Sequence, residues 1–306
     1  MKIAVMGAGA LGGYFGARLA DAGQDVWFIA RGAHLAAMQT DGLIVESMKG
    51  DVHLPKVKAT DNPAEVGVAD VILFMVKNYD VIDSAHAIAP MIGPDTMVVT
   101  CQNGISAHER LGEIVGHQHV VPGVVRMPGD IPRPGVVRHT APFDRFAFGE
   151  LDGSKSDRVI RFYDALEAAG TMPEIPGNIL HDLWIKFIMQ ASFASMTTIT
   201  RLNVDAFRGE GPAQDLFINS MRETEKVARA IVPDLPDGIV EKVWALLESL
   251  PPTTHASMLD DLNNGKRLEV DYLGGDVVRL GKKYGIPTPI HETLWAALQP
   301  LKNGAA

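Results

Sequence analysis

The first twelve residues constrain the fold more than any other part of this chain. An apolar run at residues 2–6 leads directly into a G-x-G-x-x-G pattern that starts at Gly7, and a helical pattern follows from Tyr14 to Ala22. A buried strand, a glycine-rich turn and a helix in this order predict a site for the pyrophosphate of a dinucleotide, at the N-terminus of the helix. The residues expected to bind it are Gly7, Ala8, Gly9, Ala10, Leu11 and Gly12.

Each glycine of the pattern has a separate expected task. Gly7 makes the tight turn after the strand, Gly9 lets the backbone approach a pyrophosphate, and Gly12 lets the helix pack closely on the strand. Glycine turns are common, so the pattern alone is weak evidence. Its position between a strand and a helix is what favours a dinucleotide site over an ordinary turn.

The second apolar run, residues 25–30, ends at Arg31. Folds that prefer NAD usually place an aspartate or glutamate near this point to hold the ribose 2′-hydroxyl, and this run ends without one. A guanidinium can instead hold a 2′-phosphate with two parallel hydrogen bonds. We therefore predict NADP(H) as the cofactor, with Arg31 on its 2′-phosphate. The alternative is a solvated arginine at a strand end.

The composition indicates a globular protein of about two domains. The chain has 306 residues, of which 46% are hydrophobic and 21% charged, so it can bury a large core. A net charge of −9 argues against a nucleic-acid partner, and no apolar run reaches the length of a membrane span. Cys101 is the only cysteine, and the N-terminus lacks the features of a secretory signal. We expect a cytoplasmic protein that acts on a small molecule, without a membrane partner or a metal site.

Apolar runs alternate with helical patterns through the first half of the chain. This alternation predicts the α/β class, with a Rossmann-type, doubly wound parallel sheet covered by helices on both faces. The expected strands are 2–6, 25–30, 43–46, 70–76, 96–101 and 119–125, with 136–139 and 145–149 extending the sheet. The expected helices are 13–22, 33–39, 80–92, 106–115 and 157–169.

The second half of the chain carries only helical patterns. Pro173 and Pro176 interrupt the alternation, so we expect a dinucleotide-binding domain over 1–173 and an all-α domain over 174–306. The helical half is large enough to carry a homodimer interface, although its pattern identifies none. In such architectures the ligand lies outside the carboxyl ends of the strands, against the second domain. The expected helices are 178–199, 212–231, 237–248, 254–263, 267–284 and 291–301.

Two buried strands end in polar residues. Lys77 follows one apolar run, and Asn103 follows another within Gln102-Asn103-Gly104. A solvated strand end explains the lysine, and an Asn-Gly turn explains the asparagine. Alternatively, Lys77 faces the cofactor and Asn103 hydrogen-bonds a carbonyl or a nicotinamide amide.

Lys186 lies in the most apolar helical segment of the second half. An ammonium group is expensive to bury without a partner, so it either extends to water or faces a polar cleft. In a cleft it can hold a substrate oxygen and deliver a proton to it. Gln190, four residues further on, shares its helix face.

Glu269 and Ser257 each admit two interpretations. Glu269 shares helical spacing with Leu273, so it is either solvated or points inward toward a positive partner, for which Lys186 is the candidate. Ser257 either caps the helix that starts beside it or binds a substrate carboxylate.

In these motifs the chain resembles the ketopantoate reductase family over essentially its whole length. The resemblance implies a Rossmann fold and NADPH-dependent reduction of 2-dehydropantoate (ketopantoate) to pantoate, a step of pantothenate biosynthesis. It rests on Gly7–Gly12, Arg31, Val76-Lys77, Gln102-Asn103-Gly104, Leu183-Trp184-x-Lys186, Ser257–Leu262, Gly265-Lys266, Glu269–Tyr272 and Gly285–Pro289.

The resemblance also implies a role for each candidate residue. Lys186 would protonate the carbonyl oxygen as hydride reaches C2, and Glu269 would orient the lysine and a substrate hydroxyl. Ser257 would hold the substrate carboxylate. Asn103 would touch both cofactor and substrate, and Lys77 would line the cofactor site.

The chain departs from the family pattern at the end of the site that reads the 4-hydroxyl of the substrate. The family usually carries asparagines four and eight residues after the lysine, and here these positions are Gln190 and Ala194. Gln190 can still donate and accept a hydrogen bond, whereas the Ala194 side chain cannot. Losing such a group weakens discrimination between substrates. Two alternatives therefore stay open: a related enzyme of another 2-oxo or 2-hydroxy acid, and a non-enzymatic NADP(H) sensor.

Overall fold

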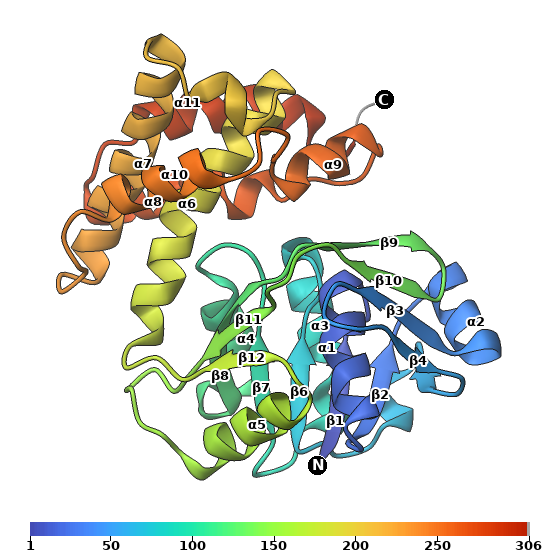
Figure 1. Cartoon of the computed structure of the whole chain (residues 1–306). Coiled ribbons are helices and arrows are strands. Elements are labelled where there is room, and N and C mark those ends of the chain that lie inside the picture. Colours follow the sequence, from blue (N-terminus) through green and yellow to red (C-terminus); the bar gives the residue numbers. More distant parts are fainter. Residues whose placement is uncertain (305–306) are drawn as a thin grey trace. The chain divides into compact units, whose positions relative to one another are not determined.

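The computed structural model describes residues 1–304, which divide into two units (Figure 1). We call Met1–Gln102 together with Ala107–Ile179 the sheet unit. The helical unit consists of Asn103–Ser106 and the described residues from Leu180 onward. The turn Asn103–Ser106 thus follows a strand of the sheet unit in sequence but makes most of its contacts with the helical unit.

An eight-stranded sheet organises the sheet unit, in the order β12-β11-β8-β7-β6-β1-β2-β5. The strands from β5 to β8 are parallel, whereas β11 is antiparallel to β8. Its strands are β1 (Lys2–Met6), β2 (Asp25–Ile29), β5 (Lys58–Thr60), β6 (Val71–Phe74), β7 (Met97–Thr100), β8 (Val120–Arg126), β11 (Arg145–Phe148) and β12 (Met172–Glu174). The chain leaves β1 toward β2 on one side and later returns to β6 on the other, which creates a topological switch point at the carboxyl ends of β1 and β6.

Helices cover both faces of this sheet, which confirms the α/β prediction. Ile3 and Val5 of β1 belong to one buried layer, and Ala4 and Met6 belong to the other, as the two-residue period of a strand requires. The first layer includes apolar residues of α1 and α5, and the second includes residues of α3 and α4. The helices are α1 (Ala10–Asp21), α2 (Gly32–Asp41), α3 (Val81–Ala87), α4 (Ala107–Val115) and α5 (Asp157–Ala168), with 3-10 turns at Pro63–Glu65, Asn78–Asp80, Ala89–Met91 and His117–His119.

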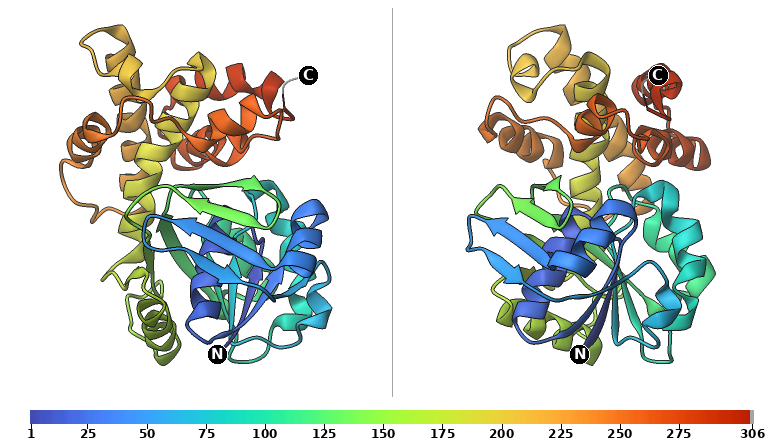
Figure 2. Two further views of the ribbon diagram at one scale, coloured as in Figure 1. Left: turned by 45° about the vertical axis from the view of Figure 1, so that its right-hand side comes forward. Right: turned by 90° about the vertical axis from the view of Figure 1, so that its right-hand side faces the viewer.

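Two of the expected strands belong to a second, four-stranded sheet (Figure 2). Its order is β4-β3-β10-β9, built from β4 (Val52–Leu54), β3 (Leu43–Ser47), β10 (Val136–His139) and β9 (Gly129–Arg133). The prediction that 43–46 and 136–139 join the main sheet was wrong, because an apolar pattern shows that a strand is buried but not which strand it pairs with. No apolar pattern marks β9, because it is an exposed edge strand that carries Pro132.

The helical unit contains no strand among its described residues, in agreement with the pattern of the second half. Its helices are α6, which begins at the last residue of the sheet unit (Ile179–Thr200), α7 (Pro212–Ile231), α8 (Ile239–Ser249), α9 (Ser257–Asn263), α10 (Gly274–Tyr284) and α11 (Pro289–Leu298), with 3-10 turns at Val204–Phe207, Val270–Tyr272 and Gln299–Leu301. None of the helices within residues 1–304 combines the length and the apolar character that crossing a bilayer requires.

One helix of this unit begins later than predicted. The expected helix 267–284 starts only at Gly274, because Leu273 has φ −108° and ψ −95°, outside the helical region. Asp271, in the preceding 3-10 turn, accepts hydrogen bonds from Trp295 Nε1 at 2.9 Å and Gln299 Nε2 at 2.6 Å. These bonds hold the turn on α11 and its continuation, and Glu269 therefore lies in a turn rather than inside a helix.

Candidate active site

The turn between β1 and α1 needs glycine at two positions for steric reasons. Gly7 has φ +98°, and a Cβ there would lie 2.9 Å from the Val76 backbone nitrogen. A Cβ on Gly12 would overlap the carbonyl oxygen of Gly7 and lie 2.7 Å from Val5 Cγ1. Gly9 differs, because apart from its two neighbours in the chain no described residue has an atom within 4 Å of the Cβ it would carry. The first and third glycines thus permit close packing, whereas the second borders open space.

The N-terminus of α1 is free to receive an anion. The N-cap residue Gly9 has no side chain with which to cap the helix, and the first turn contains no acidic residue. The first N–H groups of a helix have no intrahelical acceptor and carry a partial positive charge. Open space at Gly9 beside these donors fits the pyrophosphate of a dinucleotide.

Arg31 follows β2 and occupies the N-cap position of α2. Its side chain is 78% exposed, and Nη2 donates a hydrogen bond to Asp80 Oδ2 at 3.1 Å. Asp80 comes from the connection after β6, 49 residues away in sequence. The pairing could not be predicted, because nothing in the sequence near Arg31 points to an acid so far along the chain.

The ends of β6 and β7 are joined by a buried amide. Gln102 Nε2 donates to the carbonyl oxygens of Phe74 at 2.7 Å and Val76 at 3.2 Å. Lys77 emerges half-buried just beyond this point. Gln102 thus fixes the strand end that carries Lys77, a positioning role that its place in the sequence did not indicate.

In the helical unit, Lys186 and Asn103 are brought together. Lys186 is half-buried on α6, and its Nζ donates a hydrogen bond to Asn103 Oδ1 at 3.2 Å. At the other end of the same turn, Ser106 Oγ donates to Asp276 Oδ2 of α10 at 2.5 Å, and both side chains are buried. The turn Asn103–Ser106 is therefore attached to α6 at one end and to α10 at the other.

The helix face beyond Lys186 contains an unsatisfied polar atom. Gln190 Oε1 is buried and has no hydrogen-bond partner among the described residues. Ala194, one turn further, is 2% exposed. An unpaired buried acceptor costs about 1–3 kcal/mol, which a ligand hydroxyl at this point would relieve.

Glu269 and Ser257 have contrasting environments. Glu269 is only 5% exposed, so its carboxylate points into the protein, where a charged group needs polar partners. Ser257 is exposed and is the first residue of α9, whose N-cap is Ala256. Because Ala256 and not Ser257 occupies the N-cap position, Ser257 does not cap α9 from there, and its binding of a substrate carboxylate stays a prediction.

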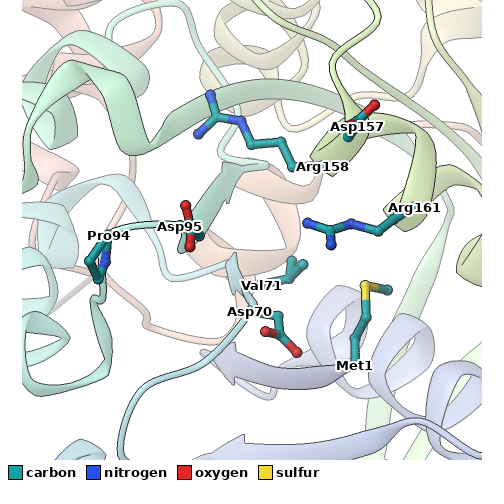
Figure 3. Close-up of a pocket in the computed structure, with 8 residues that line it drawn as sticks. All are labelled: Met1, Asp70, Val71, Pro94, Asp95, Asp157, Arg158 and Arg161. Atoms are coloured by element: carbon teal, nitrogen blue, oxygen red, sulfur yellow. The ribbon is translucent and has the colours of Figure 1, made fainter.

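A separate cavity of about 530 Å³ lies at the amino ends of the strands of the main sheet, away from the glycine turn (Figure 3). The residues that line it precede β1, β6 and β7, begin β6 or lie in the first half of α5: Met1, Asp70, Val71, Pro94, Asp95, Asp157, Arg158 and Arg161. The guanidinium of Arg158 is already bound to Glu150 at 2.7 Å. Parallel α/β sheets bind ligands at the carboxyl ends of their strands, so the glycine turn rather than this cavity is the candidate dinucleotide site.

Comparison with known proteins matches both halves of the chain to one family. The family model for ketopantoate reductase PanE/ApbA covers residues 3–153, and the model for the C-terminal part of the same family covers residues 178–302. The chain is 30% identical to a 2-dehydropantoate 2-reductase of Mesorhizobium japonicum, over 98% of each protein.

Solved structures show the same relationship. A PanE/ApbA family ketopantoate reductase from Ralstonia eutropha is 33% identical over 98% of each chain, with a TM-score of 0.90. A D-mandelate dehydrogenase, solved with NADH and anilino(oxo)acetate, is 25% identical over 98% of this chain and 97% of that one, with a TM-score of 0.89. With both halves matched and 30% identity over almost its full length, this chain belongs to the ketopantoate reductase family of oxidoreductases.

Proposed function

We propose that this protein catalyses the NADPH-dependent reduction of 2-dehydropantoate to pantoate. The observation that carries the proposal is the hydrogen bond from Lys186 Nζ to Asn103 Oδ1, because it holds a half-buried ammonium group in a fixed position. The family, whose named members include 2-dehydropantoate 2-reductases, supports the choice of substrate.

The sheet unit supplies the cofactor site in this proposal. NADPH, when bound, supplies the hydride that is added to C2 of the substrate. The backbone from Gly7 to Gly12, including Ala8, Ala10 and Leu11, holds the pyrophosphate at the N-terminus of α1. Arg31 binds the 2′-phosphate, and Lys77 lines the site.

The helical unit supplies the proton. Lys186 Nζ donates a proton to the carbonyl oxygen as negative charge develops there, and partial burial strengthens this interaction. Asn103 orients Nζ and contacts both cofactor and substrate. Glu269 orients the lysine and a substrate hydroxyl, and the hydroxyl of Ser257 holds the substrate carboxylate.

Gln190 is the residue of this chain that we assign to the 4-hydroxyl of the substrate. Its Oε1 lacks a partner among the described residues, so a hydroxyl donor bound there would satisfy a buried acceptor. A substrate without the hydroxyl would leave that acceptor unpaired, and the site would discriminate against it.

Ala194 favours a second candidate function, the reduction of a more apolar 2-oxo acid. Its buried methyl group offers no hydrogen bond where the family usually carries an asparagine. The similarity to a D-mandelate dehydrogenase solved with an aromatic oxo acid supports the same candidate. That structure contains NADH, so NADH is the alternative cofactor for this second candidate.

A substrate series read by the loss of NADPH absorbance separates the two candidates. We expect kcat/KM for ketopantoate to exceed that for 3,3-dimethyl-2-oxobutanoate, which lacks only the hydroxyl, by at least about tenfold. Gln190→Ala should remove most of this difference. If phenylglyoxylate is the better substrate, or if the hydroxyl makes no difference, the assignment to 2-dehydropantoate is contradicted.

A further inference from the structure

The ion pair between Arg31 and Asp80 connects the two loops on either side of the glycine turn. In the sheet, β1 lies between β2 and β6, so Gly7 follows the middle strand while Arg31 and Asp80 follow its two neighbours. The ends of β2 and β6 are about 10 Å apart, since neighbouring strands are spaced by about 4.8 Å. The arginine reaches across this interval to the carboxylate.

The carboxylate of Asp80 does not cap the helix that Asp80 precedes. It is the N-cap of α3, where an aspartate normally accepts a hydrogen bond from the first turn of its own helix. In the described part of the chain its carboxylate makes no such capping bond and instead accepts one from Arg31. At 33% exposed, the carboxylate is less accessible than the 78% exposed arginine.

We propose that Asp80 is a specificity-determining residue that narrows the preference for NADPH over NADH by competing with the 2′-phosphate for Arg31. This inference rests on the proposed function, because it takes the glycine turn and Arg31 as the dinucleotide site. Binding of a 2′-phosphate requires the guanidinium to leave the Asp80 carboxylate, and it brings a second anion close to that carboxylate. A dinucleotide with a free 2′-hydroxyl meets neither obstacle.

The expected effect is modest because the pair is exposed. Ion pairs at this level of exposure are weak, so releasing Arg31 from Asp80 should tighten a 2′-phosphorylated nucleotide by about three- to fivefold. The effect should shrink at high salt, since screening weakens both the ion pair and the repulsion between Asp80 and the phosphate.

Calorimetric titration of the purified full-length protein tests the proposal. The probes are NADPH and NADH, together with 2′,5′-ADP and 5′-AMP, which report on the adenosine end alone. Asp80→Asn should tighten NADPH and 2′,5′-ADP by about three- to fivefold and leave NADH and 5′-AMP within about twofold. Asp83→Asn is the matched control, because it removes the same charge from an exposed residue in the first turn of the same helix. This control should leave all four affinities within about twofold.

A double-mutant cycle identifies the mechanism. In an Arg31→Ala background, Asp80→Asn should favour 2′,5′-ADP less than in the parent, because there is no guanidinium left to release and only the repulsion between Asp80 and the phosphate is relieved. If the gain is undiminished there, or if Asp80→Asn leaves the ratio of NADPH to NADH affinity unchanged, the proposal is overturned while the proposed function stands. If the parent protein binds neither dinucleotide, the cofactor site and this inference fail together.

Discussion

The glycine turn of the sheet unit lies within six consecutive residues, whereas the lysine site of the helical unit is assembled from distant segments. Gly7, Gly9 and Gly12 act through the local path of one strand, one turn and one helix. Lys186 instead meets a residue 83 positions away, and the turn that carries Asn103 is anchored to a residue 170 positions from Ser106. A contiguous site can be recognised from a motif, whereas an assembled site depends on the tertiary fold of its unit.

The largest stability difference between the units should appear on acidification of the helical unit. His291 of α11 is fully buried, with Nε2 3.0 Å from the Ser220 carbonyl oxygen, and burial lowers the pKa of its imidazole to about 4. The unfolded chain has the higher pKa, so protonation favours unfolding. The stabilisation that comes from keeping His291 neutral is fully present above pH 6.5. The free energy of unfolding falls by about 3 kcal/mol as the pH drops from 6.5 to 4.

Hydrogen exchange of α7 and α11 at pH 7 and pH 4.5 measures this loss within the unit. His86→Gln is the control, since His86 is an exposed histidine on α3 of the sheet unit. Equal protection of α7 and α11 at the two pH values would show that His291 does not limit the acid stability of the helical unit.

A pair of alanine substitutions separates the structural glycines from the one assigned to the nucleotide. Gly12→Ala should destabilise the sheet unit by about 1–3 kcal/mol, because the new methyl group meets backbone and Val5. Gly9→Ala should change stability by less than about 1 kcal/mol, because its methyl group projects into open space, yet it should weaken NADPH binding at least about tenfold. Urea denaturation and NADPH titration measure the two effects. Unaltered NADPH affinity in Gly9→Ala would mean that the pyrophosphate lies elsewhere.

The smallest expected effect concerns the anchor of the assembled site. Ser106→Ala removes the hydrogen bond to Asp276, so the turn that carries Asn103 should hold Lys186 less firmly. We expect kcat to fall about three- to tenfold, in line with the loss of one hydrogen bond. Ser249→Ala on α8 is the control, since that hydroxyl bonds only to its own helix. Unchanged turnover in Ser106→Ala would show that Lys186 does not depend on this anchor.

The same contrast explains what could be predicted from the sequence. The order of strand, turn and helix around Gly7 follows from local patterns, and so does the helical character of the second half. The second sheet could not be predicted, because β3 pairs with β10, almost a hundred residues away. An apolar pattern does not indicate which strand is the partner. The late start of α10 did not follow either, since the backbone at Leu273 depends on bonds between Asp271 and α11.

In the site itself, single residues could be predicted but their partners could not. Lys186, Asn103 and Glu269 could each be predicted as candidate site residues, because each is a polar residue within or at the end of a segment with apolar spacing. The hydrogen bond from Lys186 to Asn103 depends on the tertiary fold. So does the pairing of Arg31 with Asp80, 49 residues apart. The anchors Gln102 and Ser106 were missed because a buried amide and a buried hydroxyl look ordinary in sequence.

The central claim is that Lys186 of the helical unit delivers the proton while the glycine turn of the sheet unit holds the pyrophosphate of the nucleotide. The most direct measurement is kcat of Lys186→Ala with ketopantoate, together with its Kd for NADPH by titration. We expect kcat to fall by at least about 100-fold while Kd stays within about threefold of the parent value. Turnover at the parental rate, or loss of NADPH binding that accounts for the lost activity, would contradict the account.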